Sequence, residues 1–189
     1  MIVQICGTNG SGKTTVARAV MAAGSPLVGG EVEIAGKHMG QLWRITGAER
    51  LLFVAGRYGE AATGGCDRIH EPKAIYPVLE YQHGVGVHVL FEGIRMTNHT
   101  DGLAFYRRVG DLTVVLLTTT LEECFAGLKA RRLAAGGPEH KELSVRDIES
   151  TVTRNKNYAF KLSQLGARVV KLTRDEAPGF ILSQFRSLK

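Results

Sequence analysis

Short apolar runs alternate along this chain with segments whose apolar residues recur at helical spacing. The runs contain many β-branched residues and leucines and have the length of buried strands. They lie at residues 2–6, 51–55, 87–93, 112–117 and 167–172. The helical spacing predicts helices over residues 14–23, 72–83, 103–110, 121–133, 145–165 and 178–188. Because strands and helices alternate, the sequence predicts an α/β fold.

The pattern is weaker between residues 24 and 45. Leu27-Val28 and residues 32–34 flank Gly29-Gly30, which is typical of a short hairpin or strand pair. The mixed stretch over residues 37–43 fits neither the strand period nor the helix period. Elsewhere, Pro77 lies inside a predicted helix and should kink that helix or end it early.

The composition is that of an ordinary soluble domain. With 189 residues, the chain has the length of one α/β domain spanning residues 1–189. Of its residues, 44% are apolar and 22% are charged, and no apolar run approaches the roughly 18 residues that a membrane span requires. The start of the chain reads as a strand and not as a signal peptide. We therefore expect no association with a membrane.

The cysteines and the net charge indicate the cellular compartment and the kind of partner. Cys6, Cys66 and Cys124 form no C-x-x-C pair, so the sequence predicts neither a disulfide framework nor a zinc site and favours a reducing cytoplasm. Lysines and arginines total 24 against 18 aspartates and glutamates, which gives a net charge of +6 and a pI near 9.4. This excess favours an anionic partner, either a nucleic acid or only the phosphates of a nucleotide.

One motif dominates the N-terminal segment. Residues 7–15 read Gly-Thr-Asn-Gly-Ser-Gly-Lys-Thr-Thr and match the phosphate-loop pattern G-x-x-x-x-G-K-[ST], with a predicted strand before it and a helix after it. That context disfavours a chance glycine-rich turn. Lys13 is expected to reach the β- and γ-phosphates, and the Thr14 hydroxyl is expected to join the ligands of Mg²⁺. The nucleotide-binding residues predicted from the motif are Asn9, Gly10, Ser11, Gly12, Lys13, Thr14 and Thr15.

A second glycine-rich segment follows the second predicted strand. It contains Gly56-Arg57-Tyr58-Gly59 and, at residues 63–68, Thr-Gly-Gly-Cys-Asp-Arg. Ligands of doubly wound sheets bind beyond the carboxyl ends of the strands, so this segment is the candidate acceptor site. Asp67 suits a general base, while Arg57 and Arg68 suit phosphate binding. Alternatively, Asp67 caps the helix that begins near Pro72 in an ordinary surface turn.

The third predicted strand ends in a carboxylate, Glu92. An acid at the end of such a strand holds Mg²⁺ in phosphate-loop proteins, so Glu92 is the candidate metal ligand beside Thr14 and a rival to Asp67 as the base. A strand-end carboxylate without a special role is the alternative. His88, on the same strand, reads as a core histidine with satisfied hydrogen bonds. Arg95 follows three residues after Glu92, in reach of acceptor or triphosphate. The predicted acceptor-binding residues are Arg57, Tyr58, Asp67, Arg68 and Arg95.

The chain is polar and basic from about residue 131 to residue 154. In phosphoryl-transfer enzymes, a mobile arm with arginines closes over the triphosphate and offsets the charge that develops on the transferred group. Arg131, Arg132 and Arg146 are candidates for this lid-like role, Arg131 as a catalytic residue and Arg132 as a nucleotide-binding residue. The alternative is a solvated loop with ordinary surface cations. The predicted catalytic residues are Lys13, Asp67, Glu92 and Arg131.

These features together resemble the nucleoside and nucleotide kinase group of P-loop proteins. The resemblance rests on the phosphate loop, the strand ending in Phe91-Glu92-Gly93, the arginine-bearing helix after the next strand, and the short C-terminal strand and helix. It implies a five-stranded parallel sheet flanked by helices on both faces, Mg-ATP as the donor, and transfer to a hydroxyl group. A GTP switch does not fit, because residues 155–158 lack the aspartate of N-K-x-D and follow no strand.

The second glycine-rich segment looks like that of phage-encoded kinases that phosphorylate 5-hydroxymethyluracil bases within DNA. This resemblance rests on Gly56-Arg57-Tyr58 and Gly64-Gly65-Cys66-Asp67. It implies that Asp67 serves the hydroxymethyl group of a flipped base, in the host cytoplasm. The alternatives are a kinase for free nucleosides or nucleoside monophosphates and a nucleic-acid-stimulated ATPase, which would need a motor partner or a second domain. The sequence leaves the oligomeric state open.

Overall fold

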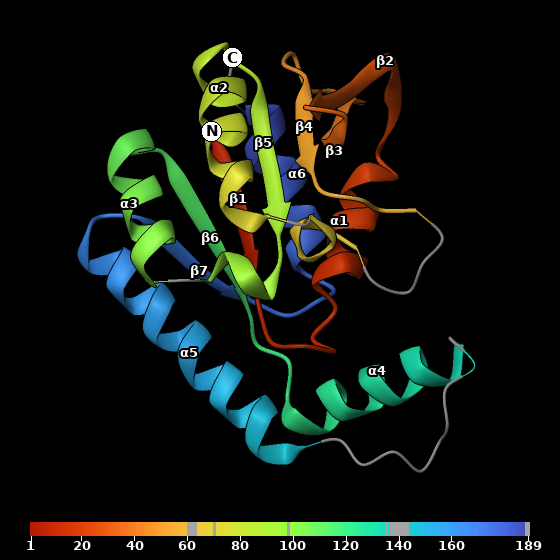
Figure 1. The fold of residues 1–189 in the computed structure, drawn as a ribbon, viewed down its shortest axis with the longest axis vertical. Coiled ribbons are helices and arrows are strands. Elements are labelled where there is room, and N and C mark those ends of the chain that lie inside the picture. The colour runs from red at the N-terminus through yellow and green to blue at the C-terminus, as the bar shows by residue number, and fades with distance from the viewer. Residues whose placement is uncertain (60–63, 70, 98, 135, 137–143, 188–189) are drawn as a thin grey trace.

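A mixed seven-stranded sheet forms the centre of the described part of the molecule (Figure 1). The computed structural model describes residues 1–59, 64–69, 71–97, 99–134, 136 and 144–187. The strand order across the sheet is β2-β3-β4-β5-β1-β6-β7. The strands are β1 (Ile2–Cys6), β2 (Gly24–Ile34), β3 (Lys37–Ile45), β4 (Leu52–Ala55), β5 (His88–Glu92), β6 (Leu112–Leu117) and β7 (Arg168–Leu172).

The five apolar runs are the five strands of a parallel core, but the prediction of a five-stranded, wholly parallel sheet was wrong. β4, β5, β1, β6 and β7 are parallel, and β2 and β3 extend the sheet as an antiparallel hairpin beside β4. The hairpin turns at Ala35-Gly36, where φ is positive at both residues. Gly29-Gly30 lies within β2, where the pairing register shifts between Pro26 and Glu31. The unassigned residues 37–43 belong to β3.

Six helices and three 3₁₀ turns accompany the strands in the described residues. The helices are α1 (Lys13–Met21), α2 (Ile75–Gly84), α3 (His99–Val109), α4 (Leu121–Ala134), α5 (Val145–Gln164) and α6 (Ala177–Ser187). The 3₁₀ turns are η1 (Cys66–Arg68), η2 (Pro72–Ala74) and η3 (Ile94–Met96). Because α2 begins at Ile75, Pro77 falls in its first turn, where the missing backbone N–H costs no helical hydrogen bond. The helix continues to Gly84 and does not end early at the proline.

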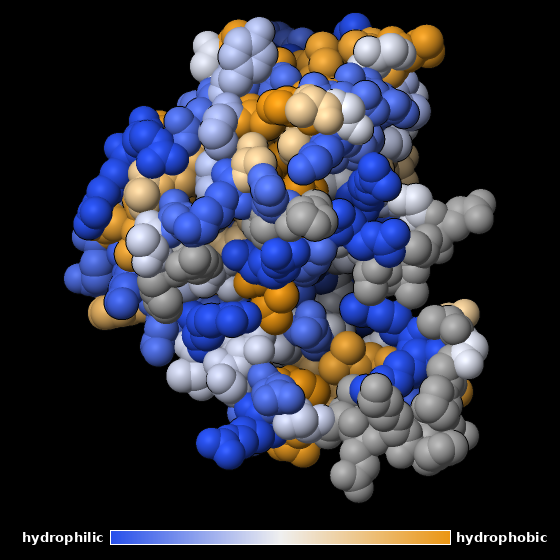
Figure 2. All heavy atoms as spheres, viewed as in Figure 1, coloured by the Kyte–Doolittle hydropathy of each residue, from blue (hydrophilic) through white to orange (hydrophobic). Residues whose placement is uncertain are grey.

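Helices cover both faces of the sheet. Alternate residues of β1 point to opposite faces: Val3 and Ile5 pack with α1 and α6, whereas Ile2 and Cys6 belong to the core under α2, α3 and α5. In Figure 1, α4 extends beyond the carboxyl edge of the sheet. Figure 2 shows apolar side chains gathered along α4 in the region facing that edge. No helix in the described part of the chain combines the length and apolar character needed to cross a bilayer.

Candidate active site

Sheet topology brings the phosphate loop, Glu92 and the second glycine-rich segment together at the carboxyl ends of β1, β4 and β5. β1 lies between β5 and β6, and Ile5 of β1 pairs with Glu92 at the end of β5. The phosphate loop, which continues β1, is therefore a direct neighbour of Glu92. β4, on the other side of β5, leads into the second glycine-rich segment, where Arg57 and Gly65 form an isolated antiparallel bridge.

Glycines in the phosphate loop have conformations and neighbours that exclude a side chain. Gly10 and Gly12 have φ values of +81° and +91°, in the left-handed region that favours glycine. A Cβ atom on Gly10 would overlap the carbonyl oxygen of Cys124 in α4. A Cβ atom on Gly12 would meet the side chain of Arg174 at 2.6 Å. The loop is thus held between α4 and the segment after β7.

The N-terminus of α1 is open to an anion. Gly12 is its N-cap residue and offers no side-chain hydrogen bond, and no acidic residue lies in the first turn. The first N–H groups of a helix lack intrahelical acceptors and carry a partial positive charge, which suits phosphate binding. The buried hydroxyl oxygens of Thr8 and Ser11 also lack hydrogen-bond partners among the described residues. These groups fit the phosphates of a nucleotide.

Lys13 is a buried cation between two acids. Its side chain is 7% exposed, and its Nζ donates a hydrogen bond of 2.8 Å to the carbonyl oxygen of Thr8. Burial lowers the pKa of Lys13, while the charges of Glu92 and Asp67 act in the opposite direction. The ammonium therefore lies at the point where the loop and both predicted acids meet.

Glu92 and Thr14 form a direct contact. The Thr14 hydroxyl donates a hydrogen bond of 2.8 Å to Oε1 of Glu92, whose residue is 1% exposed. Burial raises the pKa of Glu92 to about 7, against the opposing effects of Lys13 and of the Thr14 hydrogen bond. A hydroxyl and a carboxylate are hard oxygen ligands of the kind that Mg²⁺ prefers, so these two side chains fit a Mg²⁺ site.

Gly65 allows the second glycine-rich segment to approach Glu92. Its φ is +73°, and a Cβ atom there would overlap Oε1 of Glu92. Gly56, with a φ of +97°, is similarly close to the backbone of Gly65. Both positions require glycine because backbone or a carboxylate occupies the space that a side chain would take. Residues 60–63, including Thr63 of the predicted acceptor segment, lie outside the described residues.

Asp67 caps a different element from the one suggested by the sequence. Its Oδ2 accepts a hydrogen bond of 3.0 Å from the backbone N–H of Ile94, and its Oδ1 accepts one of 3.1 Å from that of Arg95. These amides belong to η3, directly after β5, so Asp67 does not use these oxygens to cap the helix near Pro72. The two bonds fix its carboxylate next to the end of β5, and the residue stays half-buried.

The remaining predicted acceptor residues lie around this cluster in different environments. Tyr58 has a buried hydroxyl without a hydrogen-bond partner in the described chain, and burial, followed by the charge of Glu92, raises its pKa well above the usual value. Arg57 and Arg68 are exposed. Arg95 is also exposed and donates a hydrogen bond of 3.3 Å to the carbonyl oxygen of Ile69.

The predicted lid arginines lie on two helices. Arg131 and Arg132 are half-buried in the last turn of α4, and Arg146 is exposed in the first turn of α5. Burial has the largest effect on the pKa values of Lys13 and Glu92, lowering the first and raising the second. The charge of Arg131 acts on both in the direction of a lower pKa, so this charge reaches the site. Residues 135 and 137–143 of the predicted lid lie outside the described residues. A lid over residues 131–154 remains a prediction.

Comparison with known proteins identifies the family. No protein-family model matches the chain. This chain is 30% identical over 185 residues to a protein named 5-hmdU DNA kinase from Pseudomonas phage PaMx11. The alignment covers 93% of this chain and 92% of the relative. The chain belongs to the 5-hmdU DNA kinase family. The resemblance of the second glycine-rich segment to phage-encoded DNA kinases is thereby confirmed.

In this member of the 5-hmdU DNA kinase family, several contacts of the phosphate loop were missed by sequence reasoning. The Thr119 hydroxyl donates to the backbone oxygen of Ser11 at 3.0 Å, and a Cβ atom on Gly127 would lie 2.6 Å from the oxygen of Gly10. Arg174 lies against Gly12. These residues belong to no sequence motif. The glycine at position 127, inside a helix pattern, was the one signal of a close approach.

Proposed function

We propose that this protein is an ATP-dependent kinase that transfers the γ-phosphate to the hydroxymethyl group of 5-hydroxymethyluracil in DNA. The observation that carries the proposal is the cluster of Lys13, Thr14 and Glu92 beside Asp67, at the carboxyl ends of β1 and β5. The relative's name supports DNA as the acceptor. The net charge of +6 agrees with an anionic partner. The parallel core and its phosphate loop support a single P-loop kinase domain.

The residues of the loop fit the donor. The N-terminus of α1, the N–H groups of the loop and Lys13 would hold the phosphates, and Arg131 and Arg132 would approach them from α4. Thr14 and Glu92 would hold Mg²⁺, Glu92 either directly or through water. When bound, ATP supplies the phosphoryl group and Mg²⁺ offsets its charge.

The surroundings of the two acids separate their roles. The Oε1 atom of Glu92 accepts the Thr14 hydrogen bond and lies against the backbone of Gly65, so a hydroxyl on DNA has poor access to it. Asp67 is half-buried, and each of its oxygens retains a lone pair beyond the one engaged by η3. We therefore assign Asp67 as the base that accepts the proton of the acceptor hydroxyl, and Glu92 as the metal ligand. Tyr58, Arg57, Arg68 and Arg95 would contact the acceptor.

The test is transfer of labelled phosphate from ATP to a matched panel of acceptors. Two oligonucleotides of one sequence would carry either a single 5-hydroxymethyluracil or thymine at the same position. Free 5-hydroxymethyldeoxyuridine and its monophosphate complete the panel. We expect label only on the hydroxymethylated oligonucleotide. Labelling of the free compounds instead would support a nucleoside or nucleotide kinase, and DNA-stimulated hydrolysis without transfer would support an ATPase.

The base assignment has its own test. Asp67→Asn should lower kcat about 10²-fold or more while changing the KM for ATP little, because it removes proton acceptance and not phosphate binding. Asp111→Asn is the matched control, since Asp111 lies at the amino end of the sheet against the N-terminal amine. A mild effect of Asp67→Asn, with a large loss in Glu92→Gln, would make Glu92 the base.

A further inference from the structure

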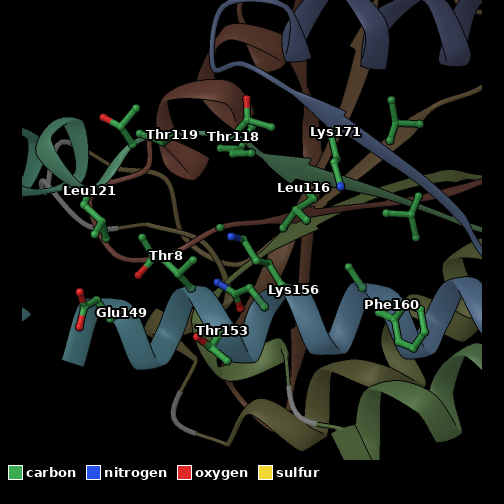
Figure 3. A pocket seen from close by; sticks show the side chains of 18 of the residues that line it. Thr8, Leu116, Thr118, Thr119, Leu121, Glu149, Thr153, Lys156, Phe160 and Lys171 are labelled. Carbon is green, nitrogen blue, oxygen red and sulfur yellow. The ribbon is translucent and has the colours of Figure 1, made fainter. Parts of the chain in front are cut away.

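A groove beside the phosphate loop has no role in the proposed reaction. It lies between α5 and the carboxyl ends of β6 and β7, has a volume of about 1400 Å³, and begins at Gly7 and Thr8 (Figure 3). Small-molecule sites commonly have volumes of roughly 300–1,000 Å³. The groove is therefore large enough for a nucleotide, and it is continuous with the loop that the donor would occupy.

Two polar side chains are buried in this groove without protein partners. Asn155 is 1% exposed, and neither its amide nitrogen nor its amide oxygen has a hydrogen-bond partner in the described chain. Thr8 is 4% exposed, and its hydroxyl is likewise unpartnered there. Buried amides and hydroxyls are normally hydrogen-bonded, because their burial is otherwise unfavourable. Both residues line the groove, and together they offer donors and acceptors of the kind found on the edge of a nucleobase.

The rest of the groove suits the other parts of a nucleotide. Phe160 is 64% exposed on α5, and an exposed ring is a platform on which a base can stack. Lys156 from α5 and Lys171 from β7 line the same groove from opposite walls, and both are labelled in Figure 3. Their charges suit a phosphate. Glu149 also lines it, nearer the start of α5, and its charge disfavours a phosphate at that end.

Position along the phosphate loop distinguishes acceptor from donor. The carbonyl oxygen of Thr8 accepts the hydrogen bond of Lys13, the residue expected to reach the β- and γ-phosphates. The groove thus opens at the γ-phosphate end of the loop. Arg174 and α4 lie instead against Gly12 and Gly10, further along the loop. The donor base is expected on that second side, because the nucleotide runs away from its γ-phosphate.

We propose that this groove binds one nucleotide of the acceptor DNA strand, with its base edge on Asn155 and Thr8 and its phosphate on Lys156 and Lys171. The inference rests on the proposed function, since it names a DNA strand as the acceptor. The base that receives the phosphate lies at Asp67, and the groove holds a nucleotide near it in the same strand. Phe160 stacks on the base next to the one held by Asn155.

A pair of asparagines on one helix provides the first test. Asn155→Leu should raise the KM for the hydroxymethylated oligonucleotide about tenfold. It should leave the KM for ATP unchanged and should not lower Tm, because it removes a buried amide without protein partners. Asn157→Leu is the matched control, because Asn157 is exposed on the same helix, outside the groove, and should change neither KM.

The lysines provide a second test that does not depend on catalysis. Binding of a fluorescent oligonucleotide is measured by anisotropy over a range of salt concentrations. With a single-stranded oligonucleotide, replacing both lysines, Lys156→Ala with Lys171→Ala, should make the slope of log K against log salt shallower by about 0.7, the value for one phosphate contact, and each single variant should have a smaller effect in the same direction. Lys161→Ala, at an exposed position of α5 outside the groove, should not change the slope.

The outcomes separate the two proposals. If the wild type phosphorylates DNA and Asn155→Leu leaves the KM for DNA unchanged, the groove assignment is wrong and the proposed function stands. A higher KM for ATP would place the donor in the groove, and a lower Tm with equal losses for both substrates would give Asn155 a structural role; either overturns the inference. If the wild type phosphorylates no DNA but binds it, and the lysine variants change the salt dependence of binding as expected, the proposed function alone fails.

Discussion

The two ends of β5 bury two titratable side chains in opposite settings. His88 begins the strand and Glu92 ends it, and they are 0% and 1% exposed, respectively. Burial disfavours the charged form of each, lowering the pKa of His88 to about 4 and raising that of Glu92 to about 7. His88 stacks on Phe185 with a ring-centre separation of 5.1 Å, and its ring nitrogens lack hydrogen-bond partners among the described residues. Glu92 contacts Thr14 and is influenced by Lys13.

The difference shows what position in a parallel sheet does to a buried polar group. At the amino end of β5, the ring of His88 is packed as part of the core next to α6. At the carboxyl end, the segments after β1, β4 and β5 converge: Glu92 has the Thr14 hydroxyl and the charge of Lys13 nearby, and backbone amides after β5 hold Asp67. His88 lies in the core, as the sequence predicted. Among the described residues of these two regions, the groups that suit the proposed reaction lie at the carboxyl end, in agreement with the general rule for open α/β sheets.

Removing the cation at the carboxyl end should have the largest effect. Lys13→Ala is expected to reduce phosphate transfer by a factor on the order of 10³ or more, because the charge on the transferred group loses its closest stabilising cation. The fold should persist, since burial already lowers the pKa of Lys13 and its charge is costly to bury. Transfer assays and circular dichroism measure the two effects. Wild-type turnover in this variant would contradict the donor site.

Neutralising the acid should separate activity from stability. Glu92→Gln is expected to lower transfer about 10²-fold through loss of the metal ligand. At pH 8 it should raise the Tm of the nucleotide-free protein by a few degrees, because a buried carboxylate is replaced by a neutral isostere. Glu80→Gln, on the outer part of α2 and paired with Arg108, is the control and should not affect transfer. A fall in Tm for Glu92→Gln would argue against an unfavourable burial of the charge.

The close approach of Gly65 to Glu92 can be broken directly. Gly65→Ala is expected to destabilise the protein by about 2–3 kcal/mol, or roughly 5–10 °C in Tm, and to lower transfer, because it combines a positive φ with an overlap on the carboxylate. Gly36→Ala is the matched control. Its φ is +69°, but no atom lies within 4 Å of its added Cβ, so it has the backbone strain alone. If the two variants lost the same stability, the overlap between the added Cβ atom and Glu92 would contribute nothing.

The protonation of His88, at the amino end of β5, should affect the stability of the fold and not phosphate transfer. The folded pKa of His88 is about 4 and the unfolded value is 6.5, so the unfolded state binds more protons between these values and stability falls as pH falls below 6.5. The loss is about 1 kcal/mol at pH 5.5 and at most about 3 kcal/mol near pH 4. The N-terminal amine of Met1 and Arg50 favour the low pKa, and Asp111 opposes them.

His88→Phe should remove this part of the pH dependence, because the variant has no ring nitrogen to protonate while keeping an aromatic side chain against Phe185. Denaturant unfolding of both proteins at pH 5 and pH 8 measures the difference between their pH dependences. Phosphate transfer at pH 8 should be unchanged. An identical pH dependence in the two proteins would show that His88 titrates normally in the fold.

Local patterns were sufficient for the parallel core and for the phosphate loop. Each of the five core strands is a continuous apolar run, and the loop needs glycines and a lysine at set spacings, which a sequence displays directly. The hairpin was misread for an equally local reason. Gly29-Gly30 has the composition of a turn, but Gly30 is needed inside β2 because a side chain there would meet Leu42. The real turn has Ala35 before Gly36, where asparagine is usual, so its turn signal was weaker than that of Gly29-Gly30.

The sequence by itself determined which residues form the phosphate-loop motif and which apolar runs become strands, because both depend on neighbours within a few positions. Only the tertiary structure decided which partners the polar groups at the strand ends have. Asp67 bonds to amides 27 and 28 residues away, and Thr14 bonds to a carboxylate 78 residues away. The placement of Asn155 and Thr8 in one groove likewise depends on how α5 packs over the sheet. Such contacts join segments distant along the chain, and the spacing of residues carries no record of them.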